Sequence, residues 1–392
     1  MDREPIPWHK RAMADPAKKS VVIIGGGLMG TSAALGLAER GFSVTVLEKA
    51  LPGAEASSAA AGILGPEIEN VRPGPLLELC RMSRRLYPEW IRRLHKATSL
   101  DTDFHEGGSF DVAFSEAELK DKRTRRAFQT ETRSGEDLSG DEARQRIAAL
   151  SEEAKGAIHF PDDAHIAPRK LFRATRIAAE RAGVTIRSGV GVRGLDFASS
   201  EQKKVSGVLL DDGSKLRADW TVVAAGSWTP LVSGLPLERG AIVPARGQVI
   251  ELDGHFPRFQ SVLFGSDIYM VPRSDGRVVV GSTLEFVGYQ KAVTAQGVHR
   301  LLSGAMRLVP SLAQAELVDS WSNFRPYTPD ERPIVGTFGI EGLIVASGHY
   351  RMGILLAPIT AQIVLSLAEG RPAPLDLAPF EPRRSFAGSA AR

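Results

Sequence analysis

The chain has 392 residues with a formal net charge of +3, and 43% of them are hydrophobic, which suffices for two or three domain-sized units with buried cores. The small net charge, with Lys and Arg spread among acidic residues, excludes a polybasic nucleic-acid-binding protein. The single cysteine, Cys80, excludes an intramolecular disulfide and a multi-cysteine metal site, and it fits a cytoplasmic protein. We find no apolar run of about 18 residues, so we expect no membrane-spanning helix and no membrane partner.

The N-terminal 19 residues are polar and basic, and they lack the apolar centre of a secretory signal. We interpret residues 1–19 as a disordered extension. Residues 21–24 then form a short apolar run, which is typical of a strand buried on both faces. Residues 28–39 are expected to form a helix, and residues 43–47 a second strand.

A glycine-rich turn, Gly25-x-Gly27-x-x-Gly30, lies between the first strand and the helix. The first glycine permits a tight turn, the second lets the backbone approach a pyrophosphate, and the third lets the helix pack closely on the strand. The helix N-terminus attracts the phosphate, and Glu48, 18 positions after Gly30, is placed to accept hydrogen bonds from ribose hydroxyls. We therefore predict a dinucleotide site. The motif alone does not separate FAD from NAD, and a glycine-rich turn without a ligand is the alternative.

A run of small residues, AEASSAAAGILG at positions 54–65, follows. Small side chains let the backbone pack against a flat ring, although an alanine-rich helix start would have the same composition. The next segments predict a long amphipathic helix at 75–98, a strand or hairpin at 104–114, a charged helical region at 115–150 and a loop at 159–168. His159 and His165 have no Cys or His at metal-binding spacing, so we assign no metal.

The rest of the chain alternates short apolar strands with helices. In order, it predicts a helix at 169–182, a strand at 184–186, a hairpin of 205–210 with 216–220, strands of a different sheet at 243–252, 269–284 and 317–325, a helix at 298–308, a buried strand at 343–349, a helix at 353–369 and a Pro-rich, mobile tail at 370–392.

Three apolar strands end in small residues and glycine, at 21–27, 221–227 and 343–349. The ligand crevice of an open parallel sheet lies at the carboxyl ends of its strands, so these three ends indicate one discontinuous nucleotide domain. The fold class is therefore α/β, with a Rossmann-like domain on a parallel sheet and an α+β substrate domain on an antiparallel sheet. The predicted boundaries are 20–75, 155–240 and 330–370 for the first domain, 76–154 and 241–329 for the second, and 371–392 for the tail.

Besides the glycine-rich turn, five segments carry a family resemblance: SSAAAGIL at 57–64, PDDAHIAP at 161–168, YMVPRSDGRVVVGST at 269–283, NFRPYTPDERPIVG at 323–336 and ASGHYRMGILLAPIT at 346–360. Over residues 20–370 the chain resembles the FAD-dependent D-amino-acid oxidase class, and most closely the glycine oxidases of bacterial thiamine biosynthesis. The resemblance implies FAD rather than NAD, oxidation of a small primary or secondary amine acid, and a homotetramer. Related sarcosine oxidases tether FAD through a Cys in the C-terminal half of the chain. No Cys follows Cys80 in this sequence, so the resemblance implies non-covalent FAD.

The resemblance also assigns roles by position. The substrate carboxylate would meet Arg325 and Tyr269, with Arg351 close by. The implied cofactor-binding residues are Gly25, Gly27, Leu28, Met29, Gly30, Glu48 and Lys49 for the adenine nucleotide half, Ser57, Ser58, Ala61, Gly62 and Ile63 for the flavin, Val192 for the adenosine side, and His349, Tyr350, Arg351, Met352, Gly353, Ile354 and Leu355 for the pyrimidine edge of the flavin.

The residue types suit these roles. Arg325 has a planar fork that binds both oxygens of a carboxylate, and Tyr269 adds a phenolic donor. A solvated arginine before Pro326 and a packing tyrosine on a hairpin are the alternatives, and Arg351 contacts either substrate or flavin. Asp267 and the triplet at 350–352 depart from some family members, which leaves the substrate open among glycine, sarcosine and D-alanine.

The implied reaction is an oxidative deamination, in which the cofactor performs the difficult step. A hydride leaves the substrate α-carbon for flavin N5, the imine is hydrolysed to a 2-oxo acid and ammonia, and molecular oxygen reoxidises the flavin to give hydrogen peroxide. A substrate bound as the neutral amine needs no dedicated base. The alternatives are a dehydrogenase that passes electrons to a quinone or carrier, a non-enzymatic nucleotide-binding module and, less favoured, an NAD-dependent enzyme.

Overall fold

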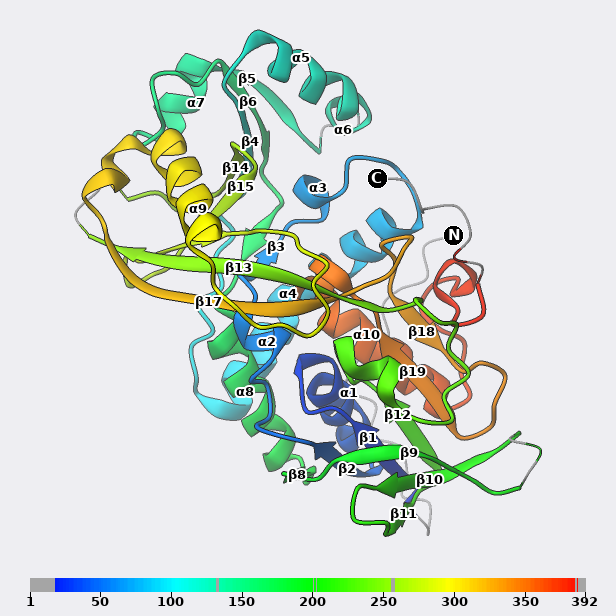
Figure 1. Cartoon of the computed structure of the whole chain (residues 1–392). Coiled ribbons are helices and arrows are strands. Elements are labelled where there is room, and N and C mark those ends of the chain that lie inside the picture. The colour runs from blue at the N-terminus through cyan, green and yellow to red at the C-terminus, as the bar shows by residue number, and fades with distance from the viewer. Residues whose placement is uncertain are drawn as a thin grey trace.

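A computed structural model describes residues 18–131, 134–199, 201, 203–254, 258–384 and 386. The predicted N-terminal extension lies outside the described residues except for Lys18 and Lys19. Two large sheets organise the described chain, one in the upper part of Figure 1 and one in the lower part. This architecture matches the predicted fold class, while the exact domain boundaries stay a prediction.

The lower sheet has six strands in the order β18-β19-β12-β1-β2-β8, and all neighbouring pairs are parallel except β18 with β19. The three strands with small-residue ends, β1, β12 and β19, belong to this one sheet, as expected, and they are neighbours in it. The strands are β1 (Ser20–Ile24), β2 (Ser43–Glu48), β8 (Thr185–Ser188), β12 (Trp220–Val223), β18 (Ile334–Gly336) and β19 (Leu343–Ser347).

The six-stranded sheet is the middle of three layers, because alternate residues of a strand face opposite sides. Val21 and Ile23 of β1 pack in the same core as four helices, α1 (Leu28–Glu39), α4 (Pro75–Thr98), α8 (Pro168–Arg181) and α10 (Gly353–Ala368). Val22 and Ile24 pack instead with a small sheet of three strands, β9 (Val192–Phe197), β10 (Val205–Leu210) and β11 (Lys215–Arg217).

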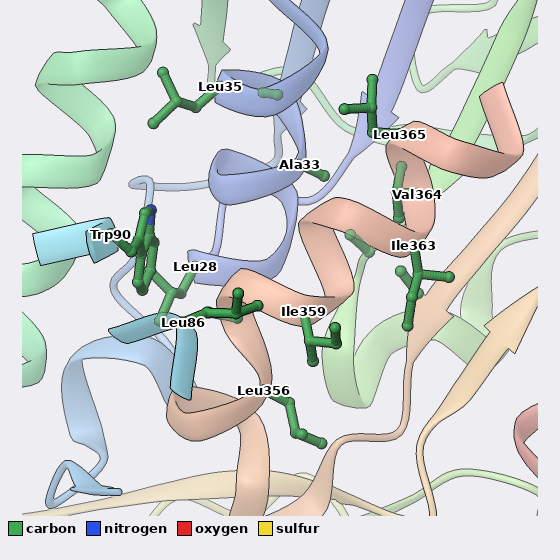
Figure 2. Close-up of a cluster of buried hydrophobic side chains, with 14 of the residues drawn as sticks. Leu28, Ala33, Leu35, Leu86, Trp90, Leu356, Ile359, Ile363, Val364 and Leu365 are labelled. Atoms are coloured by element: carbon green, nitrogen blue, oxygen red, sulfur yellow. The ribbon is translucent and has the colours of Figure 1, made fainter. Parts of the chain in front are cut away.

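Helix α10 is almost wholly apolar because it lies inside the helical layer. Figure 2 shows its side chains Ile359 and Ile363 in the cluster that also holds Leu28 of α1 and Trp90 of α4. The stretch Tyr350–Ala368 is long and apolar enough to cross a membrane, which corrects our expectation that the chain has no such run. Since 83% of this stretch is buried inside the fold, its hydropathy is explained by core packing.

The upper sheet has eight strands in the order β17-β13-β16-β15-β14-β4-β6-β5, and only β14 with β4 is parallel. Helix α9 (Ala295–Leu308) packs on it through Leu301, Ala305 and Leu308. The strands are β4 (Ser109–Ala113), β5 (Glu136–Ser139), β6 (Gly156–Phe160), β13 (Val243–Asp253), β14 (Val262–Gly265), β15 (Ile268–Pro272), β16 (Val278–Gly281) and β17 (Glu316–Tyr327).

Short segments account for the remaining helices and strands. They are α2 (Ala56–Ala59), β3 (Ile63–Leu64), α3 (Pro66–Glu69), α5 (Glu116–Arg125), α6 (Ala127–Glu131), α7 (Gly140–Arg146) and β7 (Ala164–His165), with short 3-10 helices at Gly226–Leu231, Pro310–Gln314, Tyr350–Met352 and Ala378–Phe380. Strands β3 and β7 pair with each other.

The structure corrects several sequence-based expectations. The region 115–150 is not only helical, because β5 interrupts it and pairs with β6. The segment 159–168 is not a single loop, since it contains the end of β6 and all of β7. The hairpin strand expected at 216–220 is divided: β11 ends at Arg217, and Trp220 begins β12 of the other sheet. These strands are short, and their pairing in a sheet, which a local pattern does not reveal, stabilises them.

The C-terminal segment is anchored where we expected a mobile tail. Phe380 is 1% exposed and packs in the same core as the helical layer. Arg384 donates from Nε to Oδ2 of Asp330 at 2.7 Å, and this ion pair is mostly buried. The expectation of mobility is therefore wrong for residues 371–384, while residues 385 and 387–392 lie outside the described chain.

Candidate functional site

A cavity of about 570 Å³ joins the two sheets. It begins at the carboxyl ends of β1, β2, β12 and β19, where Gly25, Glu48, Ala224 and Ser347 line it. It continues along α2 and ends on one face of the eight-stranded sheet, at residues from β13, β15 and β17. The cavity therefore extends from the predicted nucleotide end to the predicted substrate end.

The glycine-rich turn forms the first end of the cavity. Gly25 has φ +107°, and a Cβ there would lie 2.5 Å from the carbonyl oxygen of Ala224, so a larger residue would be strained. A Cβ at Gly30 would lie 2.1 Å from the carbonyl oxygen of Gly25, which shows how closely α1 lies on the turn. The Leu28 N–H at the start of α1 donates to Oγ of Ser57 at 2.8 Å.

Glu48 ends β2 beside this turn. Its Oε2 accepts a hydrogen bond from the Gly26 N–H and its Oε1 accepts one from the Ala50 N–H, both at 2.9 Å. The carboxylate thus holds the glycine-rich turn against the segment after β2 while it lines the cavity. Val192 lines the same end, together with Arg193 and Asp211, which the sequence analysis did not single out.

The small-residue segment forms the middle of the cavity. Ser57, Ala61, Gly62 and Ile63 line it, and Arg273 supports the segment by donating from Nη2 to the Ala61 carbonyl oxygen at 2.7 Å. Burial is the main cause that lowers the pKa of Arg273, to about 10, so it stays a cation at neutral pH. The sequence did not lead us to this role of Arg273, although the residue stands in the segment 269–283 that carries the resemblance.

Arg325 and Tyr269 form the far end, and each lies over a glycine of a neighbouring strand. A Cβ at Gly247 of β13 would lie 2.4 Å from Nη1 and Nη2 of Arg325, and a Cβ at Gly281 of β16 would lie 2.4 Å from the Tyr269 hydroxyl. The strand order β17-β13-β16-β15 places both glycines between the two side chains. Arg325 and Tyr269 therefore converge from outer strands over two inner strands that have no side chain at these positions.

The guanidinium of Arg325 has neutral partners. Nη1 donates to the Thr283 carbonyl oxygen at 3.2 Å, and Nη2 donates to Oγ of Ser282. Throughout the described ranges, no carboxylate forms an ion pair with Arg325. A cation with neutral partners in a cavity is suited to bind an anionic ligand.

Arg351 is held differently. Its Nε lies 3.5 Å from Oε2 of Glu69, its Nη2 lies 3.4 Å from Oε2 of Glu331, and its guanidinium lies over the Tyr350 ring. Burial raises the pKa of the Tyr350 phenol, Arg351 and Arg325 lower it, and Glu331 and Glu69 raise it. The four charged groups thus all act on the hydroxyl of Tyr350.

His349 lies in the same wall of the cavity but is buried. Its Nε2 is 3.0 Å from Oγ1 of Thr360, and burial lowers its pKa to about 3. The ring is therefore neutral at physiological pH. It is poorly suited to bind an anion or to act as a protonated acid.

Most of the predicted site residues line this one cavity. They are Gly25, Gly27, Leu28, Met29, Glu48, Lys49, Ser57, Ala61, Gly62, Ile63, Val192, Tyr269, Arg325, His349, Tyr350, Arg351, Gly353 and Ile354. Four predicted residues do not line it: Gly30, Ser58, Met352 and Leu355. Gly30 lies under the turn, and Met352 and Leu355 face the helical core instead.

Sequence reasoning missed several lining residues, including Glu69, Gly247, Trp228 and Asn323. One signal was present: a glycine inside a strand pattern marks a close approach of another group, and Gly247 stands in such a pattern. Glu69 gave no comparable signal, since it follows the small-residue segment as one acid among many.

A glycine-rich turn at the carboxyl end of a parallel sheet defines a dinucleotide-binding protein, and here this turn shares one cavity with an arginine on an antiparallel sheet. The sequence model of the FAD dependent oxidoreductase family matches residues 20–367, so the chain belongs to this family. FAD is therefore its cofactor, as the resemblance to the D-amino-acid oxidase class implied, and that resemblance is confirmed.

Three similar proteins show the relationship in detail. The chain is 40% identical over 354 residues to a bifunctional protein ThiO/ThiG of Synechocystis sp., with 88% of this chain and 51% of that protein covered. It is 35% identical to a glycine oxidase of Geobacillus kaustophilus, with 92% and 95% covered. The crystal structure of glycine oxidase from Geobacillus kaustophilus matches with a TM-score of 0.88 at 33% identity and covers 94% of this chain and 100% of that one.

The chain spans about half the length of the ThiO/ThiG relatives but nearly the whole of the glycine oxidase. These matches confirm the prediction of an FAD-dependent enzyme of the amino-acid oxidase type. The particular substrate and products belong to the proposal that follows.

Proposed function

We propose that the chain oxidises glycine, or another small amine acid such as sarcosine or D-alanine, to a 2-oxo acid and ammonia (methylamine in the case of sarcosine) with release of hydrogen peroxide. The observation that carries this proposal is the guanidinium of Arg325, which lies in the cavity with only neutral hydrogen-bond partners among the described residues. A small carboxylate is an anion that fits the planar guanidinium at this end of the cavity. The relatives named glycine oxidase support the same substrate class.

The residues present fit FAD. The glycine-rich turn has no side chain at Gly25 or Gly27 that would block a pyrophosphate, and Glu48 lines the cavity at the ribose position. The small residues Ala61 and Gly62 offer a flat wall to the flavin ring. Bound FAD supplies the two-electron acceptor for the hydride of the substrate. We propose non-covalent binding, because the one cysteine, Cys80, is buried in the core and does not line the cavity.

The chain itself binds and orients the substrate. Arg325 would hold both carboxylate oxygens, and the Tyr269 hydroxyl would donate to one of them, so the amine and the α-carbon point away from the eight-stranded sheet. The guanidinium of Arg325 binds the carboxylate as a cation, so this step needs no proton transfer. His349 is unsuited to serve as an acid because it is neutral and engaged with Thr360. A substrate bound as the neutral amine would need no base from the protein.

Three further parts of the proposal concern context. We propose a place in thiamine biosynthesis, which the resemblance implied and the relatives named ThiO/ThiG support. A cytoplasmic location and a homotetramer stay predictions from the sequence and the resemblance.

The test is an absorption spectrum of the purified, FAD-loaded protein before and after anaerobic addition of glycine. We expect the flavin bands to bleach with glycine and to return with oxygen as peroxide forms. Acetate, which has the carboxylate without the amine, is the control and should shift the bands without bleaching them. Protein that binds FAD but is reduced by neither glycine, sarcosine nor D-alanine would contradict the proposal.

The same experiment separates the oxidase from a dehydrogenase. Flavin that is bleached by glycine but returns slowly in oxygen and rapidly with an electron-accepting dye would replace the oxidase by a dehydrogenase. Peroxide formed in proportion to the glycine consumed would exclude this alternative.

A further inference from the structure

The two arginines at the substrate end, Arg325 and Arg351, lie in different charge environments. Arg325 donates to a carbonyl and a hydroxyl, which are neutral. Arg351 lies between two carboxylates, Glu69 and Glu331. Both guanidiniums line the cavity, but the charge of Arg351 is already balanced by carboxylates before an anion binds.

The two carboxylates around Arg351 are also unequal. The side chain of Glu69 is 10% exposed and lines the cavity, whereas that of Glu331 is 49% exposed and does not. Water screens the exposed partner, so the ion pair with Glu331 contributes little. The compensation of Arg351 inside the cavity therefore comes mainly from Glu69.

The turn that ends in Glu69 is held unusually firmly. Asp163 accepts from the N–H groups of Glu67 and Ile68 at 3.2 and 3.1 Å. Arg126 donates to the carbonyl oxygens of the same two residues at 3.1 and 2.9 Å, and Gln129 donates to that of Glu67 at 2.8 Å. Arg126, Gln129 and Asp163 are buried, so the position of Glu69 is fixed before any ligand binds.

The charges therefore sum to one excess positive charge at the substrate end: Arg325 and Arg351 contribute two, and Glu69 removes one. A ligand with a single carboxylate neutralises this excess. A ligand with two carboxylates leaves an uncompensated negative charge close to Glu69, which disfavours binding.

We propose that Glu69 is a specificity-determining residue, which compensates Arg351 and so makes the site select monocarboxylates over dicarboxylates. This inference rests on the proposed function, because it assumes that the substrate carboxylate binds at this end of the cavity. It assigns to Glu69 a role in the choice of substrate and none in the chemical step.

The experiment measures the dissociation constants of acetate and malonate, which differ by one carboxylate and are not amines. The readout is the shift of the flavin absorption bands of the FAD-loaded protein, at a pH above the second pKa of malonate. We compare wild type with Glu69→Gln, Glu331→Gln, Arg351→Gln and the double variant Glu69→Gln/Arg351→Gln. Glu341→Gln, on an exposed ion pair with Lys204, is the control outside the cavity.

In Glu69→Gln we expect malonate binding to improve about tenfold relative to acetate, since the excess charge becomes two. Glu331→Gln should change this ratio by less than about threefold, because water already screens that carboxylate. The double variant should restore the wild-type ratio. The substrates should follow the same order, with iminodiacetate gaining on glycine in Glu69→Gln.

An unchanged malonate-to-acetate ratio in Glu69→Gln would overturn the inference, as would a double variant that keeps the altered ratio. If Glu69→Gln does not fold, Arg351→Gln still decides, because it should lower the ratio about tenfold and no change would overturn the inference. Wild-type protein that binds FAD but neither acetate nor glycine would instead remove the proposed function.

Discussion

The guanidinium of Arg325 on β17 lies over Gly247 on β13, so close that a methyl group at position 247 would stand 2.4 Å from both of its terminal nitrogens. In the antiparallel register Gly247 faces Asn323, two residues before Arg325, and the long side chain reaches diagonally over the glycine. The absence of a side chain on one strand thus sets the position of a cation on the next.

We predict that Gly247→Ala lowers kcat/KM for glycine about tenfold to a hundredfold, because the displaced guanidinium no longer meets the substrate carboxylate. The free energy of unfolding should change by less than about 1 kcal/mol, since only the end of a flexible side chain has to move. Steady-state kinetics and denaturant unfolding of the same preparation check both parts. Wild-type kinetics in this variant would show that the placement of Arg325 over Gly247 is not important for binding.

Arg325→Ala should lower kcat/KM by about 10²-fold or more, because loss of one partner of a buried charge pair costs roughly 2–5 kcal/mol. FAD should stay bound, which the absorption spectrum after gel filtration reports. Arg176→Ala, an exposed arginine paired with Glu180 on α8, is the matched control and should behave as wild type. Equal kinetics of the two variants would remove Arg325 from substrate binding.

Tyr269→Phe removes only the hydroxyl that lies over Gly281. A neutral hydrogen bond contributes roughly 1 kcal/mol net, so we expect kcat/KM to fall about tenfold. The effect should appear in the KM for glycine and in the dissociation constant of acetate. A thousandfold loss would assign Tyr269 a role beyond a hydrogen bond to the carboxylate.

Asp163 predicts a pH dependence of stability. Burial, opposed by hydrogen bonds from Ser109 and from the Glu67 and Ile68 backbone, raises its pKa from 3.8 to about 7. Between these two values the folded chain binds the proton more tightly than the unfolded chain. The contribution of Asp163 to the free energy of unfolding therefore falls as the pH rises from about 4 to 7, by at most about 1.4 kcal/mol per pH unit, and is constant above 7.

The measurement for Asp163 is a comparison of unfolding free energies across this pH range. The difference between wild type and Asp163→Asn isolates the residue from other titrating groups, such as His165 and His349, whose pKa values burial lowers. Asp162→Asn, on the exposed neighbouring residue, is the control and should track wild type. A constant difference between wild type and Asp163→Asn from pH 4 to 7 would contradict the raised pKa.

Phe380→Ala should destabilise the protein by about 3 kcal/mol or more, because it leaves a cavity where a 1%-exposed ring packs against the helical core. The control Phe286→Ala also removes a phenyl ring, but from a position that is 56% exposed, and it should lower the free energy of unfolding by less than about 1 kcal/mol. Thermal unfolding of both variants tests whether the C-terminal segment is part of the core. Equal melting temperatures would show that it is not.

The sequence predicted those parts of the fold that depend on local patterns. The helices Leu28–Glu39 and Pro75–Thr98 begin and end at the expected residues, because a glycine or a Pro at the start and apolar periodicity mark them. Strand β5 was missed because only Leu138 of its four residues is buried, and it exists through pairing with β6. The buried Phe380 was missed because Pro-rich composition says nothing about where a segment packs.

The site divides in the same way. The glycine-rich turn and Arg325 each stand in a short continuous sequence motif, and they lie at the two ends of one cavity. The relationship of Arg325 to Gly247 and that of Arg351 to Glu69 join residues that lie far apart in the sequence. Such relationships depend on sheet register and on the packing of α3, which a single sequence does not contain.

The order of strands in the six-stranded sheet has a consequence for synthesis on the ribosome. Strand β1 is synthesised about 200 residues before its neighbour β12, and β19 follows later still. Closing such long loops makes folding slow. The apolar faces of β1 therefore stay without β12 while translation continues. A nascent chain that ends before residue 343 lacks β19, one of the four strands whose ends begin the cavity. We therefore expect the flavin nucleotide to bind only after β19 has been synthesised.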